Sequence, residues 1–417
     1  MYQRNIAFRI DEAMGDTPVV LVIGPRQSGK STLVTRIAAD RGIPYRTLDD
    51  ATALAAAGSD PSGYLRGLGD RAVIDEVQRV PELALAIKAS VDRDRRPGRF
   101  ILTGSTNVMT VPILSDSLAG RVEVIYLNPL SQGEIVGVRE TFAEALFSSA
   151  FPAAAHSTAM TRGDLVRRVL TGGFPEATTR RSELRRQAWF DSYVSTVIQR
   201  DVRDISRIAE LSDLPRVLLT LAQRTGSLLN ASELSRTTGI AATTLSRHLD
   251  ILGAIFLFHR LPAWSANVGK RLVKAPKIHL VDSGMAGALC GLDEATASER
   301  GDRFGPLLET FVVQEIRKQR TWSRLSYREY HYRSSAGAEV DCVLEAPDGR
   351  VVGIEVKGSA TVRAGDFRGL RSLRDDAGKR FIRGVILFDG RESVVFDDGL
   401  AAIPIDALWS RWGESFS

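Results

Sequence analysis

The chain has 417 residues, of which 44% are hydrophobic, with a net charge of +5 and a pI of about 9.3. This length predicts about three domains, and the apolar content is sufficient for real cores. No stretch reaches the ~20 apolar residues that a membrane-spanning helix needs, and the first residues lack the apolar segment of a signal peptide. Two cysteines are too few for a disulfide framework or a metal cage. We therefore expect a cytoplasmic protein whose mild basic charge permits nucleic acid as a partner without requiring it.

A glycine-rich loop is the first feature with a specific chemistry. It follows the apolar run 18–23, which predicts a strand, and precedes the helical pattern 33–37. The spacing G-x-x-x-x-G-K-[ST] is typical of a P-loop, in which backbone N–H groups and a helix N-terminus hold phosphate oxygens. We expect Lys30 to reach the β- and γ-phosphates of ATP and the Ser31 hydroxyl to complete a Mg²⁺ shell. The predicted nucleotide-binding residues are Gly24, Pro25, Arg26, Gln27, Ser28, Gly29, Lys30, Ser31 and Thr32.

Two acids end a second apolar strand, which covers residues 71–76. Asp75 is placed to hold Mg²⁺ through water, and Glu76 to polarise the attacking water. A solvated acidic pair is the alternative, but the pair lies one strand crossover beyond the P-loop. Another strand, 99–104, ends in small polar residues, of which Ser105 is the predicted sensor of the γ-phosphate.

Further strands are expected at 45–48 and 122–127, so strands alternate with helices along the first 135 residues. This alternation predicts a parallel, doubly wound α/β sheet with its ligand at the carboxyl ends of the strands. We expect a P-loop ATPase domain over residues 1–135.

The middle of the chain divides into two predicted parts. Residues 136–213 read as a helical lid or linker, with an Ala/Ser-rich loop or loose insert at 143–159 and a helix at 183–204. Residues 214–300 read as a winged helix-turn-helix with helices at 214–223, 230–239 and 242–252. The third helix is expected to expose Thr243, Thr244, Arg247 and His248. It either enters a DNA major groove or packs as a lid beside the nucleotide and helps to assemble subunits.

The last part, residues 301–417, predicts an α/β domain of the restriction-endonuclease type. A helix at 305–318 precedes strands at 328–333 and 337–344, a turn at Asp348-Gly349 and a return strand at 351–357. The hairpin brings Asp341 beside Glu355 and Lys357, a pattern typical of nucleases that hold Mg²⁺ at a scissile phosphate. Glu309 on the helix is a further predicted metal ligand. The alternatives are a solvated Glu–Lys strand pair and a nuclease-like fold kept as a binding module.

The chain as a whole resembles bacterial and archaeal AAA+-type ATPases that end in a PD-(D/E)XK nuclease-like domain of unknown function. The matching segments are 24–32, 74–83, 100–107, 118–121, 127–134, 172–176, 199–202, 277–284, 337–341 and 354–358. The resemblance implies ATP binding, a winged-helix middle and a nuclease-like end. It also places Arg121 at a family position after the fourth strand, where it stabilises γ-phosphate charge in its own or a neighbouring subunit. The alternative for Arg121 is a surface salt bridge.

These patterns together favour a Mg²⁺-dependent ATPase that assembles as a homo-oligomer. Its nucleotide state would control a C-terminal half that binds or cleaves DNA. The alternative is a nucleotide-gated regulatory or protein-interaction switch with a catalytically inactive nuclease-like domain.

Overall fold

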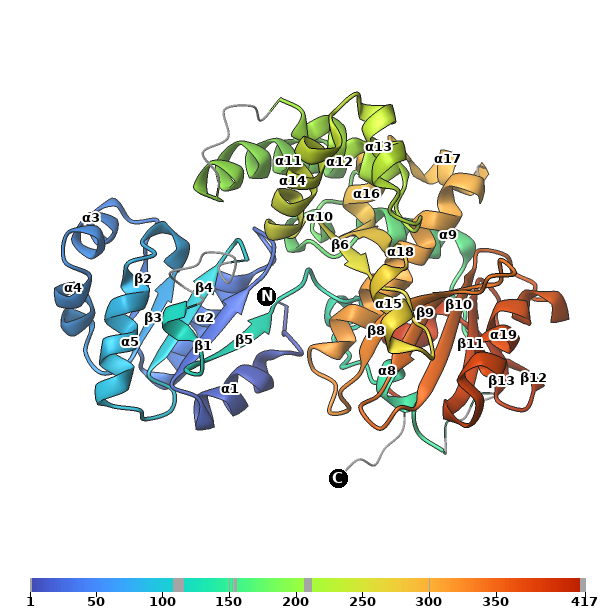
Figure 1. The fold of residues 1–417 in the computed structure, drawn as a ribbon, viewed down its shortest axis with the longest axis horizontal. Coiled ribbons are helices and arrows are strands. Elements are labelled where there is room, and N and C mark those ends of the chain that lie inside the picture. Colours follow the sequence, from blue (N-terminus) through green and yellow to red (C-terminus); the bar gives the residue numbers. More distant parts are fainter. Residues whose placement is uncertain are drawn as a thin grey trace.

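The computed structural model describes residues 2–107, 116–149, 151, 153, 156–205, 212–299 and 301–412. Figure 1 shows its three parts: a parallel sheet between helices in blue and cyan, a layer of green helices, and a mixed sheet in orange and red. Among the described residues, every helix is too short or too polar to cross a bilayer.

The five strands predicted at the start of the chain are confirmed, and all of them run parallel. Their order in the sheet is β2-β3-β4-β1-β5, so the P-loop follows a strand with neighbours on both sides. All ten residues of β1 and β4 are buried, as expected for the centre of a sheet with helices on both faces. The strands are β1 Val19–Ile23, β2 Tyr45–Thr47, β3 Ala72–Asp75, β4 Phe100–Gly104 and β5 Val122–Tyr126.

Alternate residues of β1 point to two different cores. Val20 and Val22 pack against α1 and α2, whereas Leu21 and Ile23 pack in the core that contains α4 and α5. The sheet is therefore covered on both faces, and its carboxyl edge is the part that a ligand can approach. The helices of this part are α1 Ala7–Asp16, α2 Lys30–Arg41, α3 Ala51–Ser59, α4 Pro61–Leu68, η1 Val77–Arg79 and α5 Leu83–Arg93.

The Ala/Ser-rich stretch is not a loose insert. Phe142, Phe147 and Phe151 are buried, and the Phe151 ring stacks on Trp412 with centroids 5.0 Å apart. The few aromatic residues of this stretch decide its packing, so of the two expectations, a loop or a loose insert, the loose insert was wrong. The helices on either side are α7 Gln132–Val136, α8 Phe142–Ala145, α9 Arg162–Thr171, α10 Pro175–Thr178 and α11 Glu183–Ile205.

The three helices predicted in the middle of the chain are present, followed by an antiparallel strand pair. The Asn230 side chain caps α13 by accepting a hydrogen bond from the Glu233 N–H at 3.1 Å, and Gly239 ends this helix with φ +70°. His248 is buried rather than exposed, so the predicted outer face of α14 keeps only its threonines and Arg247. The elements are α12 Leu214–Gln223, α13 Ala231–Thr238, α14 Ala242–Ala254, β6 Phe258–Leu261, α15 Val268–Val273 and β7 Lys277–Leu280.

The C-terminal sheet has the order β12-β13-β11-β10-β9-β8 and mixes parallel and antiparallel pairs. Helix α19 packs on one face of this sheet, and α18 packs on the other. The predicted helix and hairpin are confirmed at nearly the expected bounds. The elements are α16 Ser283–Leu289, α17 Glu294–Glu299, α18 Gly301–Arg320, β8 Arg328–Arg333, β9 Glu339–Glu345, β10 Val351–Lys357, η3 Ala364–Phe367, α19 Arg368–Ala377, η4 Gly378–Arg380, β11 Phe381–Phe388, β12 Val394–Asp397, β13 Leu400–Pro404 and η5 Ile405–Trp409.

One hydrophobic core runs through the last three predicted parts of the chain. It joins buried residues from Phe142 to Trp412, including helices α12 and α14 and the inner face of the C-terminal sheet. The N-terminal sheet has separate cores, one of which receives Trp322 from the turn after α18. The Trp322 indole also donates to the Glu140 carbonyl at 3.2 Å. The helical layer and the C-terminal sheet therefore form one packed body, to which the N-terminal sheet is attached.

Candidate functional site

Two positions in the P-loop require glycine for a geometric reason. A Cβ at Gly24 would lie 2.1 Å from the Leu127 carbonyl oxygen of the neighbouring strand end. Gly29 has φ +96°, in the left-handed region, immediately before the first residue of α2. These glycines let the loop curl closely around the N-terminus of α2, which is an arrangement suited to binding phosphate.

The Lys30 side chain points into this loop. Its ammonium donates to the carbonyl oxygens of Gly24 and Pro25, both at 2.9 Å, and its side chain is almost fully buried. Burial lowers the pKa of Lys30 to about 8, although Glu76 and Asp75 oppose the shift. In these contacts the ammonium donates to carbonyl oxygens and not to a carboxylate. It can therefore turn to phosphate oxygens when a nucleotide binds.

Asp75 at the end of β3 is held in place by two hydroxyl groups. Thr103 on β4 donates a hydrogen bond to Asp75 Oδ1, and the Tyr45 hydroxyl lies 2.8 Å from Asp75 Oδ2. Burial and the bond to Asp75 together raise the pKa of Tyr45 to about 12. Both carboxylate oxygens thus have a fixed direction before any ligand binds.

Glu76 adopts an unusual backbone conformation for a residue other than glycine. Its φ is +62°, and its backbone N–H donates to Thr103 Oγ1 at 3.0 Å. The amide nitrogen of Gln78 donates to the Glu76 carboxylate and lies 3.1 Å from Ser105 Oγ. The structure therefore brings Glu76 together with Ser105 through Gln78, and such strain at a polar strand end is typical of a functional site.

The residues around the loop fit Mg²⁺ bound together with a nucleotide. Ser31 lies in the first turn of α2, and Asp75 is close enough to influence the Lys30 ammonium beside it. A hydroxyl and a carboxylate are the oxygen ligands that Mg²⁺ prefers, and the remaining positions go to water and phosphate. Ser28 Oγ in the loop is buried and has no hydrogen-bond partner among the described residues, which leaves one more polar atom for a ligand.

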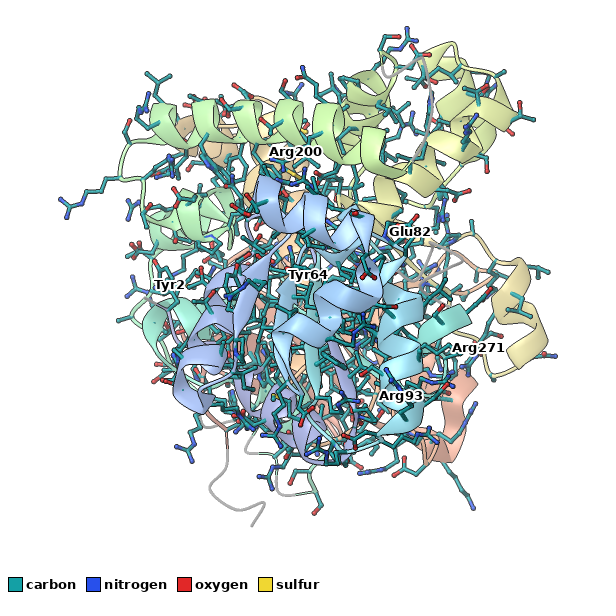
Figure 2. The ribbon with its side chains drawn as sticks, turned by 90° about the vertical axis from the view of Figure 1, so that its left-hand side faces the viewer. Tyr2, Tyr64, Glu82, Arg93, Arg200 and Arg271 are labelled. Atoms are coloured by element: carbon teal, nitrogen blue, oxygen red, sulfur yellow. The ribbon has the colours of Figure 1, made fainter. Side chains whose placement is uncertain are left out.

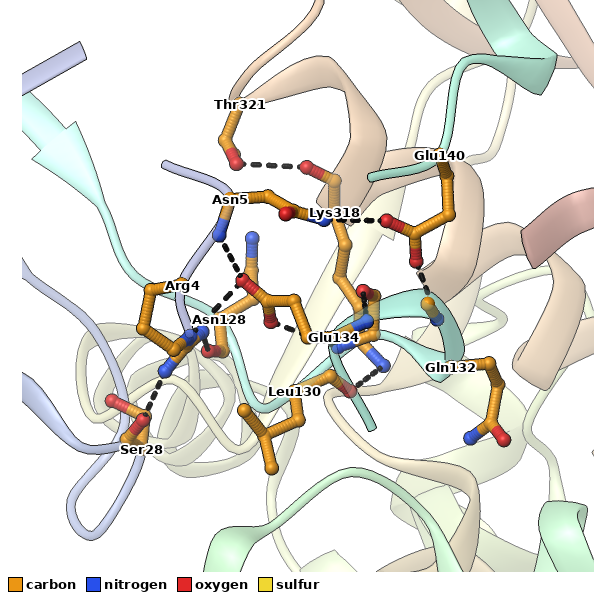
Figure 3. Close-up of polar contacts among 12 residues, drawn as sticks. Arg4, Asn5, Ser28, Asn128, Leu130, Gln132, Glu134, Glu140, Lys318 and Thr321 are labelled. Atoms are coloured by element: carbon orange, nitrogen blue, oxygen red, sulfur yellow. Dashed lines mark hydrogen bonds and ion pairs between the residues drawn. The ribbon is translucent and has the colours of Figure 1, made fainter. Parts of the chain in front are cut away.

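Arg4 connects the start of the chain to the phosphate loop, as Figure 3 shows. Its guanidinium donates to the Ser28 carbonyl and to the Asn128 carbonyl, each at 2.6 Å, and pairs with Glu134 at 3.1 Å. Glu134 is fully buried and also accepts from the Asn5 N–H. A buried ion pair thus fixes the back of the loop, a role that the sequence reasoning missed.

A small cavity adjoins the first turn of α2. Its volume is about 190 Å³, and more of its lining is apolar than polar. The residues that line it come from the start of the chain, the phosphate loop, α2, the segment before α7 and the start of α10. They are Tyr2, Arg4, Gly29, Thr32, Leu33, Arg36, Leu130 and Pro175.

Helix α11 crosses the other side of the phosphate loop. Asp201 pairs with Arg26 of the loop at 3.0 Å, and the Tyr193 hydroxyl donates to the Arg26 carbonyl at 3.2 Å. Arg200, labelled in Figure 2 where α11 passes the N-terminal helices, pairs with Asp49 at 2.9 Å. Arg79 of η1 pairs with the same Asp49 oxygen at 2.6 Å, so Asp49 links α11 to the segment after the acidic strand.

Arg121 lies far from the phosphate loop. It immediately precedes β5, whose first residue pairs with Val19 at the start of β1, whereas the loop follows the end of β1. Five residues of strand separate the two ends by ~13 Å or more. Arg121 instead forms a two-point ion pair with Asp92 at 2.7 and 2.9 Å. The expected contact with a nucleotide in its own subunit was wrong, and the surface salt bridge is the observed arrangement.

The structure also brings together the three acids of the predicted nuclease site. Asp341 on β9 accepts a hydrogen bond from the Val356 N–H on β10 at 3.0 Å, which places it beside Glu355. Burial and the charge of Asp341 raise the pKa of Glu355 to about 8, and the same causes raise the pKa of Glu309. Lys357 pairs with Glu355 at 3.1 Å.

A lysine that the sequence reasoning did not single out occupies the centre of these acids. The Lys277 ammonium lies 2.8 Å from Glu309 Oε1 and 3.0 Å from Asp341 Oδ1, and its side chain is 5% exposed. A divalent metal would need the same carboxylate oxygens, so this donor set does not fit Mg²⁺ as it is arranged. No group of three or more His, Cys, Asp or Glu residues in the described part of the chain has a metal-binding arrangement. The sequence did contain one signal for Lys277. Side chains alternate between the two faces of a strand, so Lys277 and His279 are expected on the same face of β7.

Three family models match successive parts of the chain. Residues 16–136 match the model of an AAA domain, residues 162–296 a domain of unknown function (DUF8612), and residues 304–408 another (DUF4143). The chain is 32% identical over 411 residues to protein Rv2008c of Mycobacterium tuberculosis and to protein Mb2031c of Mycobacterium bovis, covering 97% of this chain and 84% of each relative.

Similar solved structures include a Walker-type ATPase of Pyrococcus abyssi, 14% identical, with a TM-score of 0.40 over 70% of this chain and 96% of that one. Another is the RuvB Holliday junction branch migration motor of Thermotoga maritima, 20% identical, with a TM-score of 0.29 over 62% and 89% of the two chains. The 32% identity over 97% of the chain shows that the chain belongs to the family of these mycobacterial proteins, and its residues 16–136 form an AAA domain.

Proposed function

We propose that the chain binds Mg·ATP at the P-loop and hydrolyses it. The observation that carries this proposal is the meeting of the loop, Lys30 and the pair Asp75–Glu76 at one edge of the parallel sheet. Backbone N–H groups of the loop and the Lys30 ammonium bind the phosphates, and the cavity beside α2 receives the base. Mg²⁺, held by Ser31 and through water by Asp75, supplies positive charge to the phosphate oxygens.

Glu76 is the proposed general base. Its carboxylate takes a proton from water as the water oxygen bonds to the γ-phosphorus and the bond to the β,γ-bridging oxygen breaks, which yields ADP and phosphate. Gln78 keeps the carboxylate oriented, and Ser105 lies where it can sense the γ-phosphate. Arg26 exchanges Asp201 for phosphate when the nucleotide binds.

The test is phosphate release by the purified full chain with Mg·ATP. Lys30→Ala should abolish turnover while the protein stays folded, because Lys30 contributes charge rather than core packing. Lys379→Ala is the matched control, since Lys379 is exposed in the C-terminal part. Equal turnover in wild type and a folded Lys30→Ala protein would rule out hydrolysis at this loop.

We further propose that the nucleotide state is transmitted to the rest of the chain through two contacts. One is the pairing of α11 with Arg26 described above. The other is a hydrogen bond of 2.7 Å from the Asn107 N–H, just beyond β4, to the carbonyl of Ala254, the last residue of α14. Asn107 follows Ser105 by two residues, so a shift at the sensor changes the position of α14 directly.

For the C-terminal half, the contacts of Lys277 favour a nucleotide-gated switch over a DNA-cleaving enzyme. The exposed face of α14 also offers few basic side chains for phosphate contacts, which dominate DNA affinity. Hydrogen exchange should therefore change in α11 and α14 between nucleotide-free protein and Glu76→Gln protein with Mg·ATP. Cleavage of DNA that needs Mg²⁺ or Mn²⁺ and is lost in Asp341→Ala would instead support the nuclease, and tight DNA binding without cleavage would support a DNA-binding winged helix.

A further inference from the structure

We infer that the Lys277 ammonium is the resident cation of the C-terminal carboxylate cluster and takes the place that a divalent metal would otherwise hold. The cluster consists of Glu309, Asp341 and Glu355, contributed by α18, β9 and β10. It departs from the metal site that the nuclease-like sequence pattern implies. The inference does not depend on ATP hydrolysis by the N-terminal domain.

The three carboxylates of the cluster are largely buried and lie close to one another. The side chains of Glu309, Asp341 and Glu355 are 14%, 13% and 12% exposed, so water cannot fully screen their mutual repulsion. A buried carboxylate stays ionised only where a cation or hydrogen-bond donors lie within contact distance. Lys277 supplies one between Glu309 and Asp341, and Lys357 supplies another at the outer side of Glu355.

Most of the carboxylate oxygens in this cluster already accept a hydrogen bond. Asp341 uses one oxygen for Lys277 and the other for the Val356 N–H. Glu309 gives Oε1 to Lys277 and Glu355 gives Oε1 to Lys357, whereas Glu355 Oε2 is buried without a hydrogen-bond partner among the described residues. A metal ion requires oxygen contacts of about 2.0–2.6 Å, so it could enter only if the Lys277 side chain left.

Lys277 is held in position by the backbone pairing of its strand. It is the first residue of β7, which pairs with β6, and it also forms a bridge to Leu228. The adjacent His279 is fully buried, stacks on His259 and accepts or donates a hydrogen bond with Thr310 of α18 at 3.0 Å. The lysine therefore enters the cluster from a packed strand and joins the middle of the chain to the C-terminal sheet.

Mn²⁺ binding to the nucleotide-free full chain tests the inference, because Mn²⁺ uses the same oxygen ligands as Mg²⁺ and is visible by electron paramagnetic resonance. Wild type and Asp341→Asn should bind Mn²⁺ equally weakly. Lys277→Met should gain one Mn²⁺ site that binds at least about tenfold more tightly than the wild type does, since the carboxylate oxygens that Lys277 held are then free for the metal. The gain should disappear in Lys277→Met/Asp341→Asn.

Lys318→Met is the matched control, because it removes another buried lysine that pairs with Glu315 at 2.7 Å outside the cluster, and it should gain no site. A wild-type Mn²⁺ site that Asp341→Asn abolishes would overturn the inference, and this comparison needs no variant at Lys277. A folded Lys277→Met protein without new Mn²⁺ binding would overturn it as well.

Discussion

The side-chain amide of Gln78 donates a hydrogen bond to the carboxylate of Glu76, two residues earlier in the chain. The direction of this bond is fixed, because an ionised carboxylate only accepts, so the amide nitrogen and not the oxygen faces Glu76. The amide oxygen of Gln78 is buried and has no hydrogen-bond partner among the described residues. Gln78 can therefore orient the proposed base and accept a hydrogen bond from the attacking water.

Replacing Gln78 should slow hydrolysis without preventing ATP binding. In Gln78→Ala the Glu76 carboxylate loses its fixed direction, and misplacement of a catalytic group by about 1 Å costs ~10²-fold in rate. Steady-state phosphate release should show a lower kcat with KM nearly unchanged. Gln199→Ala, on an exposed turn of α11, is the control. A wild-type kcat in Gln78→Ala would mean that Glu76 needs no such support.

ATP affinity should fall as the pH rises above about 8. The free protein holds Lys30 with a lowered pKa of about 8, whereas bound phosphates favour the charged ammonium. The complex therefore binds more protons than the free protein above this pH, and a rising pH opposes binding. Titration calorimetry at pH 9 in buffers of different ionisation enthalpy should detect proton uptake. Binding that is independent of pH between 7 and 10 would contradict the buried state of Lys30.

Removing the charge of Asp201 should strengthen ATP binding. Asp201 competes with phosphate for the Arg26 guanidinium, and this pair is largely buried, with side chains 1% and 17% exposed. Asp201→Asn should lower the ATP dissociation constant by about tenfold, which corresponds to ~1.4 kcal/mol. Asp191→Asn, exposed on the same helix, should have no effect. Weaker binding in Asp201→Asn would show that Asp201 supports the loop rather than competing for it.

Arg121→Ala should leave ATP affinity unchanged at protein concentrations where the chain is monomeric. The reason is its position at the opposite end of β1, paired with Asp92. A role in a neighbouring subunit is tested by mixing Arg121→Ala with Glu76→Gln, because mixed oligomers then contain some interfaces with both groups intact. Recovered activity would support a role of Arg121 in a neighbouring subunit. No recovery despite proven subunit exchange would show that Arg121 has only a structural role.

The Lys277 ion pairs should matter more for stability than exposed pairs do. Removing one partner from a buried pair leaves uncompensated charge and costs about 3–5 kcal/mol. Lys277→Ala should therefore lower the free energy of unfolding of its cooperative unit by that amount in denaturant titrations. Arg333→Ala removes an exposed pair with Glu339 and should cost at most ~1 kcal/mol. Equal losses in the two variants would contradict the buried contacts of Lys277.

The sequence predicted those features that depend on local patterns. The five parallel strands, the cap at Asn230 and the hairpin around Asp348 follow from short-range periodicity and turn chemistry, and each is present. Asp341 and Glu355 could be placed side by side because a hairpin has only one reasonable register once its turn is known.

The features that the sequence did not reveal depend on contacts between distant segments. Arg4 reaches the P-loop across 24 residues, Asp201 reaches Arg26 across 175, and Lys277 reaches Asp341 across 64. Apart from the strand alternation at Lys277, no local pattern distinguishes these side chains from other charged residues. Arg121 shows the converse case, because its expected role came from family resemblance, and the strand register then placed it at the wrong end of the sheet.

The fate of ATP bound to Glu76→Gln tests the central claim most directly. The purified variant is incubated with Mg·ATP, and the bound nucleotide is identified by chromatography over time, beside wild type. The variant should retain ATP and hydrolyse it about 10²–10⁴-fold more slowly, because the amide keeps the shape of Glu76 but cannot take the proton. Conversion to ADP at the wild-type rate would contradict this claim.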